Sequence, residues 1–246
     1  MMNDTMIYRC ILYAALIAIA AVSIVYGQKQ FQEDVIQTSG GDLKIAFIGH
    51  GTLMFTFAGK VIHVDPVTMV YPDYASLPKA DLILVTHEHG DHLDAKAIDA
   101  IRKADTKIIC NAASAPQIAG AVVMNNGDTQ TAAGIPIEAV PAYNPDKPFH
   151  PKGNGNGYVL TFGDKRVLVA GDTENIPEIK ALKNIDVAFL PMNLPYTMTP
   201  EQVADTAKAI KPKILYPYHF GNTDTQQLVD LLKGEPGIEV RIREMQ

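Results

Sequence analysis

The sequence predicts one α/β (α+β) domain, an αββα sandwich in which two mixed β-sheets pack together and helices cover their outer faces. Short segments rich in valine, isoleucine and leucine alternate with segments of helical periodicity. Their order is β-meander, α/β, β-hairpin and α/β again, which divides the chain into two similar halves. The polar residues best suited to chemistry follow strands, and the carboxyl ends of strands are where sites form in such folds.

The expected first half begins with a β-meander, because its apolar segments are separated by glycine-containing turns. Its strands are expected at residues 43–48, 53–57 and 61–64. The next strand, residues 81–85, contains the run Leu-Ile-Leu-Val and is expected to be buried. This half is completed by a helix (94–103), a strand (107–110), a short helix (114–119) and a strand (121–124).

The expected second half begins with the strand 135–140 and a hairpin of residues 158–162 and 166–170. The segment 145–157 contains three prolines and three glycines, so it is expected to be an irregular loop. The remaining strands are expected at 186–190, 214–216 and 238–242, and the helices at 177–182, 200–210 and 224–233. Thr199 is the expected N-cap of the helix that begins at Pro200.

The composition allows a sizeable core and narrows the class of partner. Apolar residues make up 47% of the 246 residues, and the net charge is −6. The sequence contains no cluster of lysine and arginine, which argues against nucleic acid as the main partner and leaves a small-molecule substrate, including an anionic one. The oligomeric state is left open. The two cysteines, Cys10 and Cys110, are not expected to pair, and Cys110 is expected to be a buried structural thiol.

Residues 1–27 form a targeting segment, because residues 11–26 are apolar apart from Ser23 and follow Arg9. Two interpretations stay open: a signal peptide cleaved after Gly27, or an uncleaved membrane anchor over residues 7–26. Both predict an exported protein on the periplasmic or extracellular face, either secreted or tethered to the membrane. Residues 28–41 are polar and are predicted to be a linker, and residues 42–246 are predicted to be the catalytic domain.

The strand 81–85 leads directly into the sequence Thr-His-Glu-His-Gly-Asp-His, residues 86–92. Three of the seven histidines of the chain lie in this segment, which makes a merely solvated loop a poor explanation. Neutral imidazoles are common metal ligands, and a carboxylate adds an oxygen donor. On an extended loop His87 and His89 can face one ion, while Asp91 and His92 can turn toward a second. Thr86, Glu88 and Asp94 are expected to shape the loop.

This motif resembles the signature of the metallo-β-lactamase-fold superfamily of metal-dependent hydrolases. The resemblance extends from about Leu43 to the C-terminus and includes Ile-Gly-His-Gly-Thr at 48–52 and Val-Asp-Pro at 64–66. The chain looks most like the branch that contains ascorbate-phosphate lactonase-like and phospholipase D-like metallohydrolases. The resemblance implies the metallo-β-lactamase fold and a site for two metal ions.

Further ligands are expected at other strand ends. Asp172 follows the strand 166–170, and Gly171 allows the backbone to turn its carboxylate toward the sheet edge. The resemblance implies that Asp172 bridges two metals and that His219 is the final histidine ligand; the simpler alternatives are a turn-capping aspartate and a core histidine. His50 is either a residue near the metals or an ordinary turn histidine, and His63 is expected to be packed within its strand.

The ligand that would complete the first ion's site beside His87 and His89 is the hardest to assign from the sequence. The resemblance implies a histidine soon after the strand 135–140, where this chain has Tyr143 and Asn144. His150, within the loop 145–157, is therefore predicted to be a displaced ligand. The alternative is that the Tyr143-Asn144 corner completes the site, although a phenol with a pKa near 10 and a neutral amide are weaker ligands for zinc.

The predicted ligand set is His87, His89 and His150 for one ion, Asp91, His92 and His219 for the other, and Asp172 between them. Zinc suits these donors, with manganese and iron as alternatives. Such a site would generate a metal-bound hydroxide that attacks an ester, lactone, phosphodiester or amide bond, with Asp91 and Asp172 as the catalytic residues. The alternative functions are a mononuclear-iron oxidoreductase and a metal-stabilised binding protein without turnover.

Overall fold

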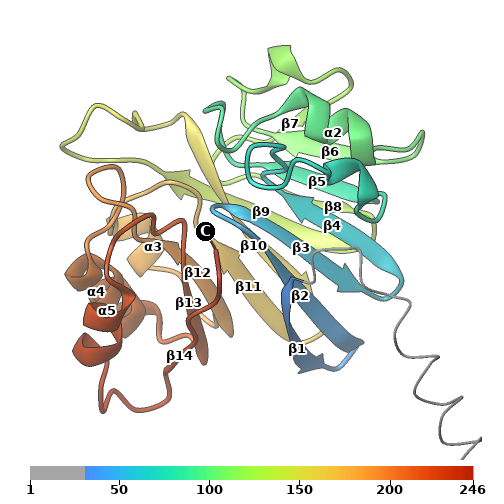
Figure 1. The fold of residues 1–246 in the computed structure, drawn as a ribbon. Coiled ribbons are helices and arrows are strands. Elements are labelled where there is room, and N and C mark those ends of the chain that lie inside the picture. Colours follow the sequence, from blue (N-terminus) through green and yellow to red (C-terminus); the bar gives the residue numbers. More distant parts are fainter. Residues whose placement is uncertain (1–30, 246) are drawn as a thin grey trace, which may run out of the picture. The chain divides into compact units, whose positions relative to one another are not determined.

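Two seven-stranded β-sheets form the centre of the domain, and helices lie on their outer faces (Figure 1). The structure is a computed structural model that describes residues 31–245. The predicted signal peptide or anchor, residues 1–27, lies outside the described residues. Among the helices within residues 31–245, none is both long and apolar enough to cross a bilayer. The predicted sandwich of two mixed sheets is confirmed.

The first sheet joins an antiparallel meander to a set of parallel strands. Its order is β1-β2-β3-β4-β5-β6-β7, antiparallel from β1 to β4 and parallel from β4 to β7. The strands are β1 (Gln32–Thr38), β2 (Gly41–Gly49), β3 (Thr52–Phe57), β4 (Lys60–Val64), β5 (Leu82–Val85), β6 (Lys107–Cys110) and β7 (Val122–Val123). Because β4 and β5 are parallel neighbours, the residues that follow them meet at one edge of the sheet.

The second sheet repeats this plan, as the order of elements in the sequence predicts. Its order is β14-β13-β12-β11-β10-β9-β8, antiparallel from β8 to β11 and parallel from β11 to β14. The strands are β8 (Thr129–Ala132), β9 (Ile135–Ala142), β10 (Gly155–Phe162), β11 (Lys165–Val169), β12 (Val187–Pro191), β13 (Ile214–Tyr218) and β14 (Glu239–Val240).

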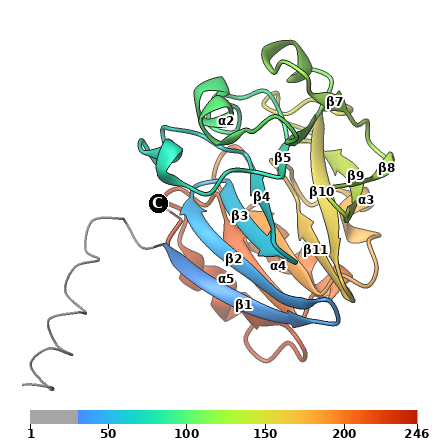
Figure 2. The same ribbon diagram turned by 90° about the vertical axis from the view of Figure 1, so that its right-hand side faces the viewer.

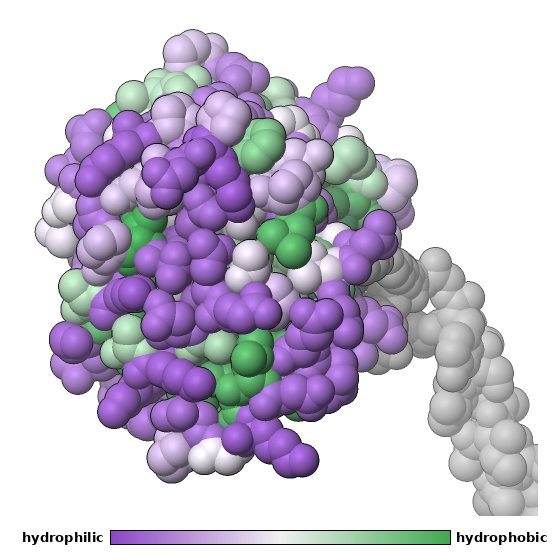
Figure 3. Space-filling model, turned by 90° about the vertical axis from the view of Figure 1, so that its left-hand side faces the viewer, coloured by the Kyte–Doolittle hydropathy of each residue, from purple (hydrophilic) through white to green (hydrophobic). Residues whose placement is uncertain are grey.

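The helices cover the two sheets from opposite sides (Figures 1 and 2). On the side of the first sheet lies α2 (Ala95–Ile101), with the short 3-10 helices η1 (Tyr74–Ser76) and η2 (Ala115–Gln117). The second sheet is covered by α3 (Pro177–Lys180), α4 (Pro200–Ile210) and α5 (Thr225–Leu231). Thr199 caps α4, as predicted, through a capping box with Gln202. The face of the molecule that carries these helices is mostly hydrophilic, with small apolar patches (Figure 3).

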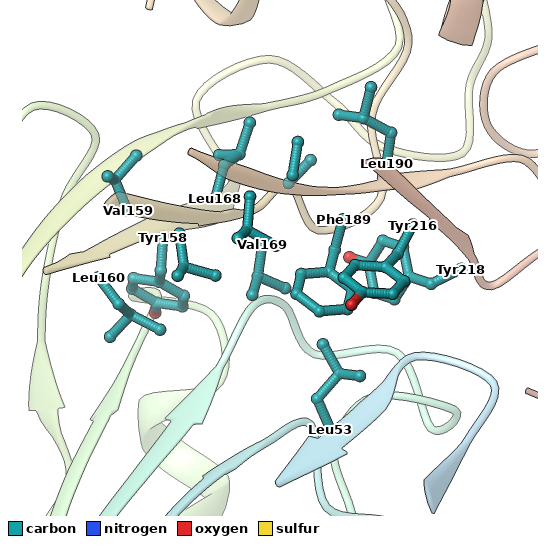
Figure 4. Packing of buried hydrophobic residues seen from close by; sticks show 14 of the residues in the cluster. Leu53, Tyr158, Val159, Leu160, Leu168, Val169, Phe189, Leu190, Tyr216 and Tyr218 are labelled. Atoms are coloured by element: carbon teal, nitrogen blue, oxygen red, sulfur yellow. The ribbon is translucent and has the colours of Figure 1, made fainter. Parts of the chain in front are cut away.

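The core fills the space between the sheets. In β2 the side chains of Leu43, Ile45 and Phe47 alternate toward the interior, as the two-residue period of a strand requires. Phe47 packs against Tyr216 of the second sheet, with ring centroids 5.1 Å apart. Leu53 of the first sheet points toward the aromatic side chains of the second (Figure 4). These contacts hold the two sheets together and so fix the strand ends relative to each other.

The prediction that residues 28–41 form a linker is wrong for residues 32–38, which form β1 and pair with β2. The domain therefore begins at Gln32 and not at residue 42. In β1 only Ile36 is buried, so the strand lacks the apolar pattern by which strands are recognised. Polar contacts contribute instead: Asp34 accepts hydrogen bonds from Arg243 at 2.7 Å and from Arg241 at 3.1 Å. The polar edge strand β8 was missed for the same reason.

Two N-terminal truncations are expected to differ in stability, because the domain begins with β1. A variant lacking residues 1–27 is expected to stay folded and to bind metal, because β1 is intact. Removing residues 1–41 deletes β1, exposes the edge of β2 and leaves Arg243 without Asp34. The lost burial of Ile36 alone is expected to cost about 2 kcal/mol, which lowers the melting temperature by about 4–8 °C. Calorimetry of both variants measures this, and equal melting temperatures would show that β1 contributes nothing to the fold.

His63 and Cys110 are packing residues, as predicted. His63 is fully buried, and its ring nitrogens contact the Tyr74 hydroxyl at 3.1 Å and the Pro78 carbonyl at 3.0 Å. Burial lowers the pKa of His63 to about 4, so the ring is neutral at pH 7. Burial also raises the pKa of the Cys110 thiol to about 11, which makes this cysteine a poor nucleophile.

Candidate metal centre

The seven residues predicted as metal ligands lie in one cluster, at the edge where the strands of both sheets end. They are His87, His89, Asp91, His92, His150, Asp172 and His219. Four follow β5, while Asp172 follows β11 and His219 follows β13. His150 comes from the loop between β9 and β10. Both sheets therefore contribute donors to the cluster.

One group of donors consists of His87, His89 and His150, whose nitrogens all lie within 4.8 Å of one another. His87 Nε2 is 3.1 Å from His89 Nδ1. The ring centroids of His87 and His150 are 5.1 Å apart, and those of His89 and His150 are 5.0 Å apart. The loop 145–157 thus carries His150 back to the residues that follow β5.

A second group consists of Asp91, His92 and His219, joined by His50. His92 Nε2 is 3.2 Å from His219 Nε2, and Asp91 Oδ2 lies 3.4 Å from His219 Nε2. His50 Nε2 lies 3.1 Å from Asp91 Oδ2, and its ring centroid is 3.9 Å from that of His219. Of the two interpretations of His50, the structure supports the one that places it beside the cluster.

Asp172 lies between the two groups. Its Oδ2 is 3.3 Å from His150 Nε2, and its Oδ1 is 3.5 Å from His92 Nε2. Gly171 has φ +65, and a Cβ there would lie 2.7 Å from the Asn156 carbonyl oxygen. Glycine is therefore required at this position for both conformation and space. The sharp turn it allows directs the Asp172 carboxylate into the cluster.

Asp65 is a site residue that the sequence marked only as part of the Val-Asp-Pro segment at 64–66. It follows β4 and is fully buried. Its Oδ2 accepts a hydrogen bond from the Thr86 hydroxyl at 2.7 Å and lies 2.7 Å from His92 Nδ1. A carboxylate in this position fixes the orientation and tautomer of the imidazole. Its place after a strand, next to the strand that carries the histidines, was the signal that could have identified it.

The Tyr143-Asn144 corner takes part in other contacts. The Tyr143 hydroxyl donates to the Glu178 carboxylate at 3.0 Å, outside the cluster. Asn144 Oδ1 lies 2.6 Å from His150 Nδ1, which leaves His150 Nε2 to face Asp172. Asn144 therefore positions His150 and does not replace it in the cluster.

Glu88 and Asp94 shape the loop, as predicted. Glu88 accepts hydrogen bonds from Asn154 at 2.7 Å and from Asn111 at 3.2 Å, which ties the loop after β5 to the loop before β10. Asp94 caps α2 by accepting from Lys96 N at 2.8 Å. The hydrogen-bond partners of both carboxylates thus lie in the surrounding loops and in α2.

The charges of the cluster depend on one another. Burial lowers the pKa of His87 well below its ordinary value, and the nearby His92 lowers it further. Burial opposes ionisation of His92, but the charges of Asp172 and Asp65 raise its pKa well above the ordinary value. Burial would raise the pKa of Asp172, yet His219 and His92 hold it well below its usual range. The protein groups alone thus pair two buried carboxylates, Asp65 and Asp172, with buried imidazoles.

The donors fit divalent metal ions. Two buried atoms, Asp172 Oδ1 and His219 Nδ1, have no hydrogen-bond partner among the residues that the structure describes, although buried polar atoms normally have one. Ligand atoms around a tetrahedral zinc ion lie about 3.3 Å apart, given zinc–nitrogen distances near 2.0–2.1 Å. The separations of 3.1 Å between His87 and His89 and 3.2 Å between His92 and His219 agree with this spacing.

A pocket of about 350 Å³ opens directly onto the cluster. Its walls are His89, Asp91, Phe149, His150, Asp172, Asn193, Tyr196 and His219. Five of these are predicted ligands, and the other three come from the loop 145–157 and the loop after β12. Phe149, Asn193 and Tyr196 were not identified from the sequence, since no motif marks them.

Replacing Asp65 by asparagine is expected to weaken metal binding by about 10–100-fold, the usual effect of losing a carboxylate that orients a ligating histidine. The asparagine keeps the size of the side chain but removes the charge beside His92 Nδ1. Competition with a chromophoric zinc chelator measures the affinity. Asp81→Asn is the matched control, because Asp81 accepts from Val61 N beside the same strand, away from the cluster. Equal affinity in both variants would contradict the role given to Asp65.

Comparison with known proteins agrees with the geometry. Residues 44–219 match the family model of the β-lactamase superfamily domain. The chain is 32% identical, over 192 residues, to a UPF0173 metal-dependent hydrolase from Thermococcus kodakarensis; the match covers 72% of this chain and 84% of the relative.

Solved structures are similar over most of their length. A protein from Parabacteroides distasonis that carries the designation metal-dependent hydrolase is 54% identical, with a TM-score of 0.85, and the match covers 88% of this chain and 100% of that one. Igni18, a metallo hydrolase from Ignicoccus hospitalis, is 25% identical with a TM-score of 0.69, covering 82% of this chain and 95% of that one.

Proposed function

Because this chain belongs to the metal-dependent hydrolases of the metallo-β-lactamase superfamily, we propose that it is a dinuclear zinc enzyme that hydrolyses an ester, lactone, phosphodiester or amide bond. The observation that carries the proposal is the convergence of seven nitrogen and oxygen donors in one cluster, five of whose residues line an open pocket. The two buried donor atoms without a hydrogen-bond partner support it further.

The donors divide between two ions. His87, His89 and His150 are assigned to the first, and Asp91, His92 and His219 to the second, because each set lies within one group of ligand atoms; a third group, His87, His92 and Asp172, connects the two sets. Asp172 is assigned to both, since its two oxygens face His150 and His92, one from each group. When bound, the ions would supply Lewis acidity and would lower the pKa of a water molecule toward neutrality.

The protein groups hold and orient the reactants in this proposal. Asp91 lines the pocket, and its Oδ2 contacts His219 and His50. These hydrogen bonds hold the pKa of Asp91 well below its usual range, against the opposing effect of burial. The carboxylate therefore stays ionised, so it can accept a hydrogen bond from the attacking water and orient it. Asp65 and Asn144 fix the imidazoles of His92 and His150.

The test combines metal analysis of the purified full chain with a panel of chromogenic esters, lactones, phosphodiesters and β-lactams. About two zinc ions per chain are expected, with turnover of at least one substrate that is lost to a chelator and restored by zinc. One iron per chain without hydrolysis would support the iron oxidoreductase instead. Two ions without turnover of any substrate would indicate a metal-stabilised binding protein.

A further inference from the structure

The pocket walls next to the donor cluster include two loops, residues 143–154 and 192–199. Together they place Phe149, Asn193 and Tyr196 beside the predicted ligands. The rings of Phe149 and Tyr196 lie edge to face, with centroids 5.0 Å apart and planes at 71°. Tyr196 is 45% exposed, so much of its apolar surface is still available for contact with a ligand.

This wall is held rigidly to the metal cluster. Asn144 Nδ2 donates to the Tyr196 carbonyl at 3.0 Å, while Asn144 Oδ1 contacts His150 Nδ1. Within the second loop, the Asn193 carbonyl accepts from the backbone N–H groups of Tyr196 and Thr197, both at 2.8 Å. The aromatic pair therefore has a fixed position relative to His150, as a substrate-binding surface requires.

The wall offers no free cation. Among residues 31–245, no lysine or arginine lines the pocket, and the two loops contain only Lys147 and Lys152. Lys147 pairs with Glu174 at 2.8 Å, and Lys152 pairs with Glu178 at 3.1 Å. Phosphate and carboxylate groups that lie away from a metal ion are usually recognised by arginine or lysine side chains, so an anionic group on the substrate beyond the reacting bond would find no partner on these walls.

From these observations we propose that the substrate is a small uncharged carboxylic ester or lactone whose acyl side carries an apolar ring or branched chain. This inference rests on the proposed hydrolase function and narrows its substrate class. The apolar group would pack against Phe149 and Tyr196, and the carbonyl would lie toward the metal cluster. A volume of about 350 Å³ is at the small end of ligand pockets, which fits a compound with one ring. Phe149 and Tyr196 are thus specificity-determining residues.

Binding of two non-reacting probes tests the apolar surface without any turnover. Acetohydroxamate and phenylacetohydroxamate share the metal-binding group and differ by one phenyl ring. Calorimetry with the zinc-loaded full chain is expected to show at least about tenfold tighter binding of the phenyl compound. In Phe149→Ala and in Tyr196→Ala this preference is expected to fall to about twofold, whereas Tyr196→Phe, which keeps the ring, should retain it. Met69→Ala, at an exposed apolar residue that does not line the pocket, is the control and should also retain it.

Measurements of turnover test the proposed substrate class separately from the proposed hydrolase function. The 4-nitrophenyl ester of phenylacetic acid is expected to have a higher kcat/KM than 4-nitrophenyl acetate and bis(4-nitrophenyl) phosphate. Preferred hydrolysis of the phosphodiester would overturn the substrate class while leaving the hydrolase function intact. If no compound is hydrolysed, the hydrolase proposal fails, and the ratio of the two hydroxamate affinities still decides whether the aromatic pair binds apolar groups. An equal affinity for both hydroxamates in the unaltered protein would refute the inference.

Discussion

Asp172→Asn is expected to lose both ions of the proposed site. Its kcat/KM is expected to fall by far more than about 100-fold, the upper end of the loss seen when a residue that orients a metal ligand is replaced. Asp172 is the carboxylate that faces both donor groups, with one oxygen 3.3 Å from His150 Nε2 and the other 3.5 Å from His92 Nε2. An amide oxygen keeps the shape but carries no charge to neutralise two cations. The measurements are metal content after dialysis against a weak chelator and kcat/KM with the best substrate of the panel.

Glu174→Gln provides the matched control for this variant. Glu174 is a buried carboxylate two positions further along the same loop, and it pairs with Lys147 instead of the cluster. Its replacement is expected to leave both ions in place, with at most a modest loss of stability. If Asp172→Asn kept two ions per chain and its activity, Asp172 would not bridge the site.

His150→Ala is expected to lose metal and activity almost as severely as His89→Ala, because both histidines belong to the same group of donors. Tyr143→Phe should keep both ions, since the Tyr143 hydroxyl binds Glu178. Asn144→Ala should be intermediate, with metal affinity reduced by about 10–100-fold, since Asn144 only orients His150. Metal stoichiometry and kcat/KM of the four variants, measured side by side, give this ranking.

The opposite ranking would contradict the assignment. If His150→Ala retained two ions and full turnover while Tyr143→Phe or Asn144→Ala lost them, the first ion would be held by the Tyr143-Asn144 corner. Melting temperatures measured in the presence of a chelator separate loss of metal from loss of the fold, because they compare the variants without bound ions.

The strand-end residues near His87 could be predicted because four donors follow one strand within a single motif. Asp172 and His219 could be predicted because each comes shortly after an apolar strand. The position of His150 could not be predicted from the sequence with the same precision, since the course of the loop between β9 and β10 depends on contacts such as Asn144 to His150 and Asn154 to Glu88. Those contacts join residues that no local pattern connects.

The supporting residues were harder to recognise for a related reason. Asp65 and His50 act through partners that are distant in sequence, so a single aspartate or histidine in a turn carries no local signal of its role. Their backbones, and that of His219, have φ values of 46–52°, a region that costs energy for residues other than glycine. Such conformations follow from tertiary packing and are invisible to residue propensities. β1 escaped recognition because Ile36 is its single buried residue, and because Asp34 pairs with arginines 207 and 209 positions later in the chain.

The division of the donors between the two sheets has a consequence for the order of events during folding. His92 and His219 are 127 positions apart, yet their Nε2 atoms lie 3.2 Å from each other. A nascent chain that has produced only the first sheet holds four of the seven donors and cannot close the proposed site. Metal would therefore enter late, once both sheets have docked, and would then act as a cross-link between the ends of a long loop. Metal depletion should for this reason speed the separation of the two sheets more than the local opening of any single helix.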